Sequence, residues 1–141
     1  MADAFARVLV HVVWAVHERE PALARSRDPR LHDLLRAQAA KQRSTLVAVG
    51  NADDHVHVLV DLHRTVAVAA LVHQLKGASA HAWNIERHEP WLRWQSGYWA
   101  ESVCAEHVDV IASYVRAQRH HHPASEPWQL REASWEPPKG A

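Results

Sequence analysis

The sequence predicts an α+β fold with the ferredoxin-like arrangement, in which split β-α-β units share one antiparallel sheet and the helices pack on one of its faces. Two observations predict this fold. Apolar runs rich in β-branched residues alternate with segments of helical periodicity in the order strand, helix, strand, strand, helix, strand, helix. The chain also has 141 residues, 48% of them hydrophobic, which suits one domain with a sizeable core. The seventh element is an additional C-terminal helix, and it carries a tyrosine.

The first predicted strand and helix precede residue 44. Residues 8–16 form a mostly β-branched apolar run without the 3.6-residue period of a helix, which predicts a largely buried strand. Asp28 and Pro29 then suit the N-cap and the first position of a helix. The apolar positions that continue at helical spacing are Leu31, Leu34 and Leu35. We expect this helix to end near Arg43 after about three turns.

The next two predicted strands form an antiparallel hairpin. Residues 45–49 are typical of a strand, and Gly50 and Asn51 are typical of the turn that closes it. Residues 55–62 are typical of a third strand, whose successive side chains point to opposite faces. One face carries only apolar residues, which are Val56, Val58, Val60 and Leu62. The other face carries His55, His57, Leu59 and Asp61.

A second helix, a fourth strand and a last helix follow. Residues 66 to about 83 show amphipathic periodicity, which predicts a crossover helix, and residues 97–103 are typical of a strand. Glu106 suits the positive N-terminal end of the last helix. The predicted buried stripe of that helix consists of Val108, Ile111, Ala112 and Val115. Residues 123–141 show no periodicity and contain two adjacent prolines, so we expect a tail without a terminal helix.

The composition limits the classes of protein to be considered. Lys and Arg number 16 and Asp and Glu also number 16, so the chain lacks the basic excess that is typical of nucleic-acid binders. Cys104 is the only cysteine, which excludes an intrachain disulfide and a thiolate metal cluster within one chain. No run approaches the ~18 uncharged apolar residues of a membrane helix, and the N-terminus does not resemble a secretion signal. We therefore expect a cytoplasmic protein that does not insert into membranes.

Two pairs of residues are the candidates for chemistry. His55 and His57 lie on one strand face with Cα atoms about 7 Å apart, close enough to share one metal ion. Tyr114 and Gln118 lie one helical turn apart at the border of the apolar stripe of the last helix, so both would reach the same neighbouring surface. Each pair also has a purely structural interpretation. The chain has 13 histidines, and a tyrosine beside an apolar stripe usually packs there with its hydroxyl in water.

Four segments carry a further signal, which are residues 54–60 with the His55-Val56-His57 motif, 75–79, 94–98 and 114–118. Taken together and in this order, they resemble the small single-tyrosine HUH transposases of insertion sequences, and residues 10–14 and 19–21 are similar to that family as well. These are the IS200-like transposases, to which the REP-associated tyrosine transposases are related. The resemblance covers roughly residues 5–122. We therefore expect a transposase domain over residues 1–122 and a tail of unknown role over residues 123–141.

The resemblance implies a function and a role for each candidate residue. His55, His57 and Gln118 would hold Mg²⁺ or Mn²⁺. Tyr114 would attack a phosphate of single-stranded DNA and form a 5′-phosphotyrosine link, so that the strand is transferred rather than hydrolysed. The substrate would be a DNA hairpin at the end of an element. The protein would be a homodimer in which the tyrosine helix of one subunit completes the site of the other.

The resemblance also implies that Lys76 and Arg64 contact DNA, although an exposed basic side chain is by default a solvated one. The chain departs from the family pattern at Cys104, where relatives commonly have a Ser or Thr that caps the last helix. This departure and the neutral net charge keep a second interpretation open, a domesticated relative that binds hairpin DNA without cutting it. A third interpretation is an unrelated hydrolase of ferredoxin-like fold whose histidines bind zinc.

Overall fold

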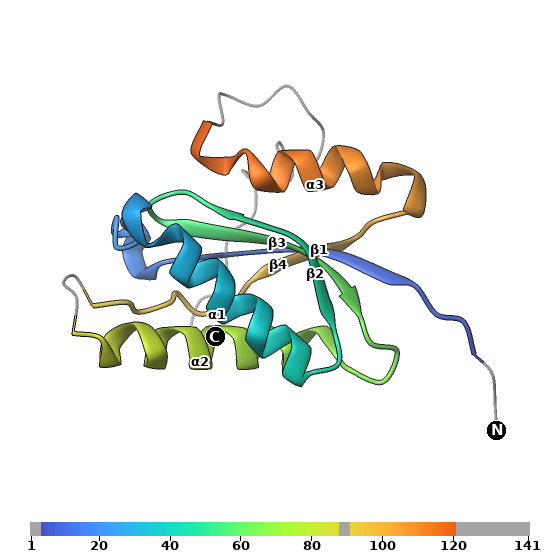
Figure 1. Cartoon of the computed structure of the whole chain (residues 1–141), viewed down its shortest axis with the longest axis horizontal. Helices are drawn as coiled ribbons and strands as arrows, with labels where there is room; N and C mark the ends of the chain where they lie inside the picture. The colour runs from blue at the N-terminus through green and yellow to red at the C-terminus, as the bar shows by residue number, and fades with distance from the viewer. Residues whose placement is uncertain (1–3, 88–90, 121–141) are drawn as a thin grey trace.

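The computed structural model of the chain describes residues 4–87 and 91–120, which form a four-stranded antiparallel sheet with helices on both faces (Figure 1). The strands are β1 (Val8–Ala15), β2 (Thr45–Asn51), β3 (His55–Leu62) and β4 (Trp99–Ser102). The α-helices are α1 (Asp28–Lys41), α2 (Val68–Ile85) and α3 (Val108–Arg116). Short 3-10 helices are η1 (His17–Arg19), η2 (Arg25–Arg27), η3 (Ala105–His107) and η4 (Gln118–His120).

The order of the strands in the sheet is β2-β3-β1-β4. β3 therefore separates β1 from β2, and β1 separates β3 from β4, as a split β-α-β arrangement requires. All three pairings, β2 with β3, β3 with β1 and β1 with β4, are antiparallel. The predicted ferredoxin-like sheet and the predicted hairpin of β2 and β3 are confirmed.

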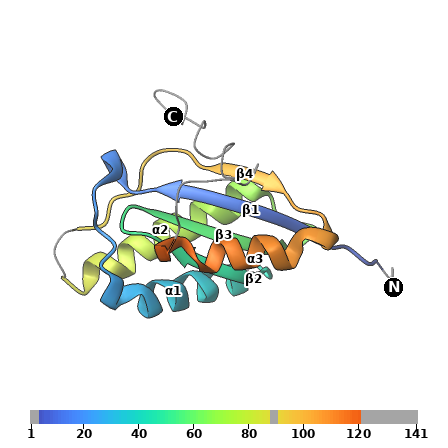
Figure 2. The same cartoon turned by 90° about the horizontal axis from the view of Figure 1, so that it is seen from above.

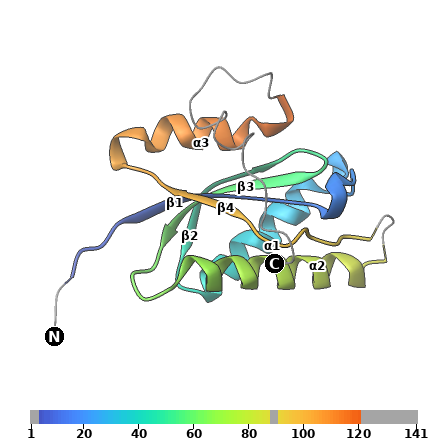
Figure 3. The same ribbon diagram turned by 180° about the vertical axis from the view of Figure 1, so that it is seen from behind.

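The helices lie in two layers, one on each face of the sheet. α1 and α2 lie together on one face, as predicted, and α3 lies on the opposite face (Figures 1 and 3). Seen from above, α3 runs along the sheet over β2 and β3, against which it packs (Figure 2). None of the helices among the described residues is both long and apolar enough to cross a membrane.

The alternation of side chains along β3 divides the interior into two clusters. Val56, Val58 and Val60 are no more than 1% exposed and belong to the main core, which contains the buried residues of α1 and α2. Leu59 points to the other face and packs in a smaller apolar cluster with Ala48 of β2. The α3 members of this cluster are Ile111, Ala112 and Val115, with Val108 packed against it. The predicted faces of β3 and the predicted stripe of the last helix are therefore confirmed.

Gly50 lies within β2 and not in a turn after it. The prediction that Gly50 and Asn51 close the strand is wrong, because Gly50 pairs with His57 and Asn51 with Val56. The backbone of α3 approaches so closely that a Cβ atom on Gly50 would lie 1.8 Å from the carbonyl oxygen of Val115. Glycine is thus required by the contact with the helix.

Asp28 does not cap α1, although its type and position predict that it does. It is the first residue of the helix, Arg27 occupies the N-cap position, and no side chain makes a capping hydrogen bond there. The carboxylate of Asp28 instead accepts hydrogen bonds from Arg119 and Asn51. A charged guanidinium is a stronger partner than a backbone N–H, so the tertiary contact prevails over the local one.

The later elements differ from the predictions mainly at their ends. α2 begins and ends two residues later than predicted, and β4 is shorter than residues 97–103. Gly97 has a positive φ of 84°, which interrupts the extended backbone before β4. The last helix begins with the 3-10 turn η3, and Cys104 before it makes no side-chain capping hydrogen bond. The predicted tail, residues 123–141, lies outside the described residues.

Substitution of Gly50 tests the contact between the sheet and α3. We expect Gly50→Ala to lower the free energy of unfolding by at least about 2 kcal/mol, because the new methyl group collides with the backbone at Val115. The matched control is Gly77→Ala at an exposed position of α2, where a Cβ meets nothing within 4 Å. That change should stabilise the protein by about 0.5–1 kcal/mol, because alanine is the better helix former. Urea unfolding measures both, and equal effects of the two changes would contradict the close approach.

Candidate functional site

The sheet face beneath α3 gathers the four residues that the sequence predicts to form a site. His55 and His57 come from β3, Tyr114 comes from α3, and Gln118 comes from η4 directly after it. The ring centroid of Tyr114 lies 5.4 Å from that of His57, and the two imidazole centroids are 5.1 Å apart. His57 and Gln118 are buried, at 1% and 4% exposure. All four side chains therefore meet within one chain.

His55 has a polar partner on each of its ring nitrogens. Its Nδ1 lies 2.6 Å from Oδ1 of Asp54, and its Nε2 lies 3.2 Å from Oε1 of Gln118. The hydrogen bond with His55 holds the pKa of the Asp54 carboxyl below its ordinary value, against the opposing effect of burial. A charged Asp54 accepts the Nδ1–H of His55, and a neutral His55 then presents a lone pair at Nε2.

The amide of Gln118 is oriented so that its oxygen faces His55. Its Nε2 donates to the backbone carbonyl of Tyr114 at 3.0 Å, which directs Oε1 toward the imidazole. With His55 neutral, two acceptor atoms therefore face each other at 3.2 Å. Such a pair is unfavourable by itself but suits a cation that both atoms can bind.

The donor set fits a divalent ion. Two ligands at right angles around Mg²⁺, each about 2.1 Å from it, lie about 3.0 Å apart, which is close to the observed separation of His55 Nε2 and Gln118 Oε1. His57 adds a second imidazole beside them. In residues 4–87 and 91–120, no three His, Cys, Asp or Glu side chains are grouped so that they could hold a metal. The three-ligand set that is typical of catalytic zinc is therefore not found in this part of the chain.

His11 is a further residue of this site, and the sequence motifs do not identify it. It lies on β1 with its Nε2 2.9 Å from Nδ1 of His57, and its ring contacts Tyr114 edge-on at a centroid distance of 5.9 Å. Burial lowers the pKa of His11 to about 4, so the ring is uncharged at neutral pH. One feature of the sequence could have pointed to His11: it is the only titratable side chain in the otherwise apolar run of residues 8–16.

Arg119 fixes the segment that carries Gln118. Its guanidinium donates to the two carboxylate oxygens of Asp28 at 2.6 and 2.7 Å and to the backbone carbonyl of Leu23 at 2.7 Å, and it also pairs with Asp53. Asp28 begins α1, Leu23 lies in the loop before it, and Asp53 lies between β2 and β3. These bonds tie the end of α3 to the start of β3, where His55 is located.

The two predicted DNA contacts lie away from the tyrosine. Lys76 is on α2, on the opposite face of the sheet, and its ammonium donates to the backbone carbonyls of Gln95 and Gly97 at 2.6 and 3.0 Å. Burial lowers its pKa from the ordinary value. Arg64 is exposed and lies two residues beyond Leu62, the last residue of β3, which is itself about 23 Å along the strand from His55. The structure does not bring either residue together with the histidines.

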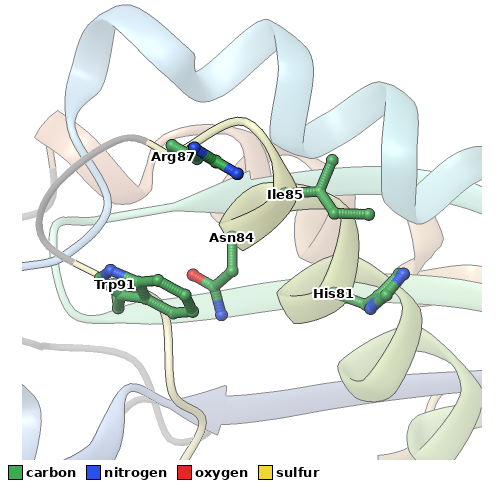
Figure 4. A pocket seen from close by; sticks show the side chains of 5 residues that line it. All are labelled: His81, Asn84, Ile85, Arg87 and Trp91. Atoms are coloured by element: carbon green, nitrogen blue, oxygen red, sulfur yellow. The ribbon is translucent and has the colours of Figure 1, made fainter.

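A surface pocket of about 710 Å³ lies at the C-terminal end of α2 (Figure 4). The side chains that line it are His81, Asn84, Ile85, Arg87 and Trp91. Because α2 and α3 are on opposite faces of the sheet, this pocket is separate from the residues around Tyr114. The candidate site lies beneath α3, where His57 and Gln118 are buried and His55 and Tyr114 are half-buried.

Comparisons with known proteins show which proteins this chain is similar to. The family model of IS200-like transposases matches residues 4–118. The ISDra2 transposase TnpA of Deinococcus radiodurans is 30% identical over 111 residues, which are 77% of this chain and 76% of that protein. A crystal structure of a putative transposase from Deinococcus radiodurans R1 has 26% identity and a TM-score of 0.65, and the match covers 84% of this chain and 96% of that one. A REP-associated tyrosine transposase bound to a REP hairpin has 12% identity and a TM-score of 0.60, over 82% of this chain and 68% of that one.

Substitution of Arg119 tests whether its bonds to Asp28, Asp53 and the Leu23 carbonyl hold the segment that carries Gln118. We expect Arg119→Gln to lower the free energy of unfolding by about 2 kcal/mol at pH 7, because Asp28 then loses its charged partner. Arg116→Gln is the matched control, since exposed Arg116 makes one hydrogen bond, to the Val47 carbonyl, and should cost less than about 0.5 kcal/mol.

The ion pair between Arg119 and Asp28 also predicts that the free energy of unfolding depends on pH. Burial alone would raise the pKa of Asp28, but hydrogen bonds from Arg119 and Asn51 and the charge of Arg119 outweigh it and lower the pKa. A carboxyl with a lowered pKa in the folded state stabilises the fold above its ordinary pKa of about 4, and loses that effect as the pH falls. The difference between wild type and Arg119→Gln should therefore shrink below pH 4 in urea titrations. A difference that stays constant from pH 7 to pH 3 would show that Asp28 is not the partner that matters.

Proposed function

Because the chain belongs to the IS200-like transposase family, we propose that it cleaves and rejoins single-stranded DNA at hairpin-containing element ends through a 5′-phosphotyrosine intermediate on Tyr114. The observation that carries the proposal is the position of Tyr114 and Gln118 on one side of α3 and η4, against His55 and His57 of β3. A tyrosine that only packed in the core would not need the imidazoles of His11 and His57 beneath it.

The proposed reaction needs a nucleophile and a leaving group. The phenolic oxygen of Tyr114 attacks phosphorus, the new oxygen–phosphorus bond forms, and the bond to the 3′-oxygen of the preceding nucleotide breaks. The departing 3′-oxygen takes up a proton and becomes a hydroxyl. The phosphotyrosine keeps the energy of the broken bond, so a 3′-hydroxyl of another strand can attack it and restore the DNA backbone without ATP.

His55, His57 and Gln118 would hold Mg²⁺ or Mn²⁺, which when bound would offset negative charge on the phosphate and favour the ionised form of a tyrosine whose ordinary pKa is ~10. The chain's own residues position this set. Asp54 directs His55 through its Nδ1, and the backbone carbonyl of Tyr114 directs the amide of Gln118. The proposed nucleophile Tyr114 and the proposed ligand Gln118 are therefore one helical turn apart and joined by a hydrogen bond.

The proposed substrate is a single-stranded DNA hairpin. A structural neighbour is described as bound to a REP hairpin, and this chain shares its fold. We propose that Lys76 and Arg64 contact the DNA backbone. Lys76 uses two donors of its ammonium for Gln95 and Gly97, which leaves one for a phosphate. Arg64 is exposed and lines a second surface pocket together with Arg43, which brings another positive charge to it.

We also propose a homodimer, as the family resemblance implies. β4 is an edge strand of the described sheet and is only half-buried, so its backbone is available for pairing with a second sheet. In the single chain, Tyr114 and Gln118 lie against histidines of the same chain. The family resemblance implies that, in the active dimer, the tyrosine helix of one subunit completes the metal site of the other, and we propose the same exchange here.

The nucleophile is tested by trapping the covalent intermediate. Wild-type protein incubated with hairpin-containing single-stranded DNA and Mn²⁺ should form an adduct that survives SDS, and Tyr114→Phe should form none. Tyr98→Phe is the matched control, because Tyr98 is the only other tyrosine and packs against the main core. An adduct that persists in Tyr114→Phe would refute the assignment, and hairpin binding by wild type without any adduct would favour the domesticated, non-cleaving relative.

The ligand set is tested through the metal requirement of the adduct. EDTA should abolish adduct formation, and added Mn²⁺ or Mg²⁺ should restore it. Gln118→Ala should raise the Mn²⁺ concentration needed for half-maximal adduct at least about tenfold, because an amide ligand is lost. Gln74→Ala on α2, which removes only a hydrogen bond to Gln38, should leave that concentration unchanged. Equal metal requirements for the two variants would exclude Gln118 as a ligand.

A further inference from the structure

We infer that His11 is a positioning residue for His57: its Nε2 accepts the Nδ1–H of His57 and so keeps the lone pair of His57 on Nε2, the nitrogen available to a metal ion. This inference rests on the proposed function, in which His57 is a ligand. It assigns a role to a residue on β1 that neither the HUH motif nor the tyrosine helix contains.

The first step is the hydrogen bond itself. Nε2 of His11 and Nδ1 of His57 are 2.9 Å apart, so one of the two nitrogens carries a proton and the other accepts it. A neutral imidazole carries one N–H, on either Nδ1 or Nε2. If His57 accepted the bond at Nδ1, its proton would be on Nε2, where it would prevent metal binding. Only the arrangement in which His57 donates keeps a lone pair, rather than a proton, on its Nε2.

The second step is that His11 is held where it can accept this bond. Its ring is inclined by 30° to that of His57 with centroids 5.2 Å apart, as expected for two imidazoles joined edge to edge by the hydrogen bond. The ring of Trp99 meets it edge-on at 5.1 Å, and that of Tyr114 does so at 5.9 Å. His11 is only 1% exposed, so water cannot easily take its place as the acceptor.

The third step is a comparison of the two histidines of the motif. His55 lies at the start of β3, and its Nδ1 faces the partly exposed carboxylate of Asp54. His57 lies two residues further into the sheet and is itself 1% exposed. A carboxylate at that depth would be costly without a paired cation, whereas a neutral imidazole accepts a hydrogen bond without bringing a charge into the core. The half-buried His55 thus has a charged partner, Asp54, and the buried His57 has an uncharged one, His11.

Two variants of the full-length protein separate this role from simple packing. His11→Leu keeps an apolar body of similar size but removes the acceptor. His11→Gln places an amide oxygen near the position of Nε2 and should restore the bond. His81→Leu is the matched control, because His81 is an exposed histidine on α2, across the sheet from the site. Circular dichroism establishes which variants are folded.

The first readout is the tautomer of His57 in metal-free protein, measured by long-range ¹⁵N–¹H correlation with ¹⁵N-labelled histidine. Wild type and His11→Gln should show His57 protonated on Nδ1, and His11→Leu should show a mixture of tautomers. A wild-type His57 protonated on Nε2 would overturn the inference. This readout needs neither metal nor DNA, so it stands even if His11→Leu does not fold or the proposed transposase reaction fails.

The second readout is the affinity for Mn²⁺ alone, measured by calorimetry. His11→Leu should bind Mn²⁺ about 10- to 100-fold more weakly than wild type, and His11→Gln and His81→Leu should bind it within about threefold of wild type. Wild-type affinity in a folded His11→Leu would overturn the inference. Absence of Mn²⁺ binding by wild type would instead refute the proposed metal site, and the tautomer measurement would still report on His11.

Discussion

The contact between α3 and the sheet is the constraint on which the rest of the site depends. The helix backbone comes so close to β2 that position 50 has no room for a Cβ atom. This close approach sets the height of Tyr114 and Gln118 above β3, and hence their distances from His57 and His55. A larger residue at position 50 would raise the helix and separate the nucleophile from the imidazoles. The positions of Tyr114 and Gln118 above β3 therefore depend on residue 50 being a glycine.

α3 cannot hold that position by helix propensity alone, because it has only nine residues and isolated helices shorter than about 12 are marginal in water. Two different interactions hold it. A small apolar cluster around Leu59 buries one stripe of the helix, and Arg119 joins the following turn to Asp28 and Asp53. The apolar contact gives affinity for the sheet, whereas the ion pairs define where the end of the helix lies along β3. Gln118, one residue before Arg119, is positioned by both.

Local periodicity predicted much of this arrangement, and its failures have a common cause. The alternation along β3 correctly assigned two residues, His57 and Leu59, to one face, and the helical spacing correctly assigned the stripe of α3 that covers that face. Asp28 was misassigned as a cap because its partner, Arg119, lies 91 positions away. Gly50 was misassigned to a turn because a helix far along the chain determines its role. His11 lies in a segment that resembles the family's first strand, but nothing in the sequence assigned it a role, and only the pairing of β1 with β3 brings it to His57.

Crystals of the protein soaked with Mn²⁺ and measured at the manganese absorption edge test the central claim most directly. Nε2 of His55 and Oε1 of Gln118 lie 3.2 Å apart with a second imidazole beside them, and these three side chains define one place for an ion. The account predicts a single strong anomalous peak within about 2.3 Å of Nε2 of His55, Nε2 of His57 and Oε1 of Gln118. A well-occupied manganese bound elsewhere, with His55 still in direct contact with Gln118, would contradict it.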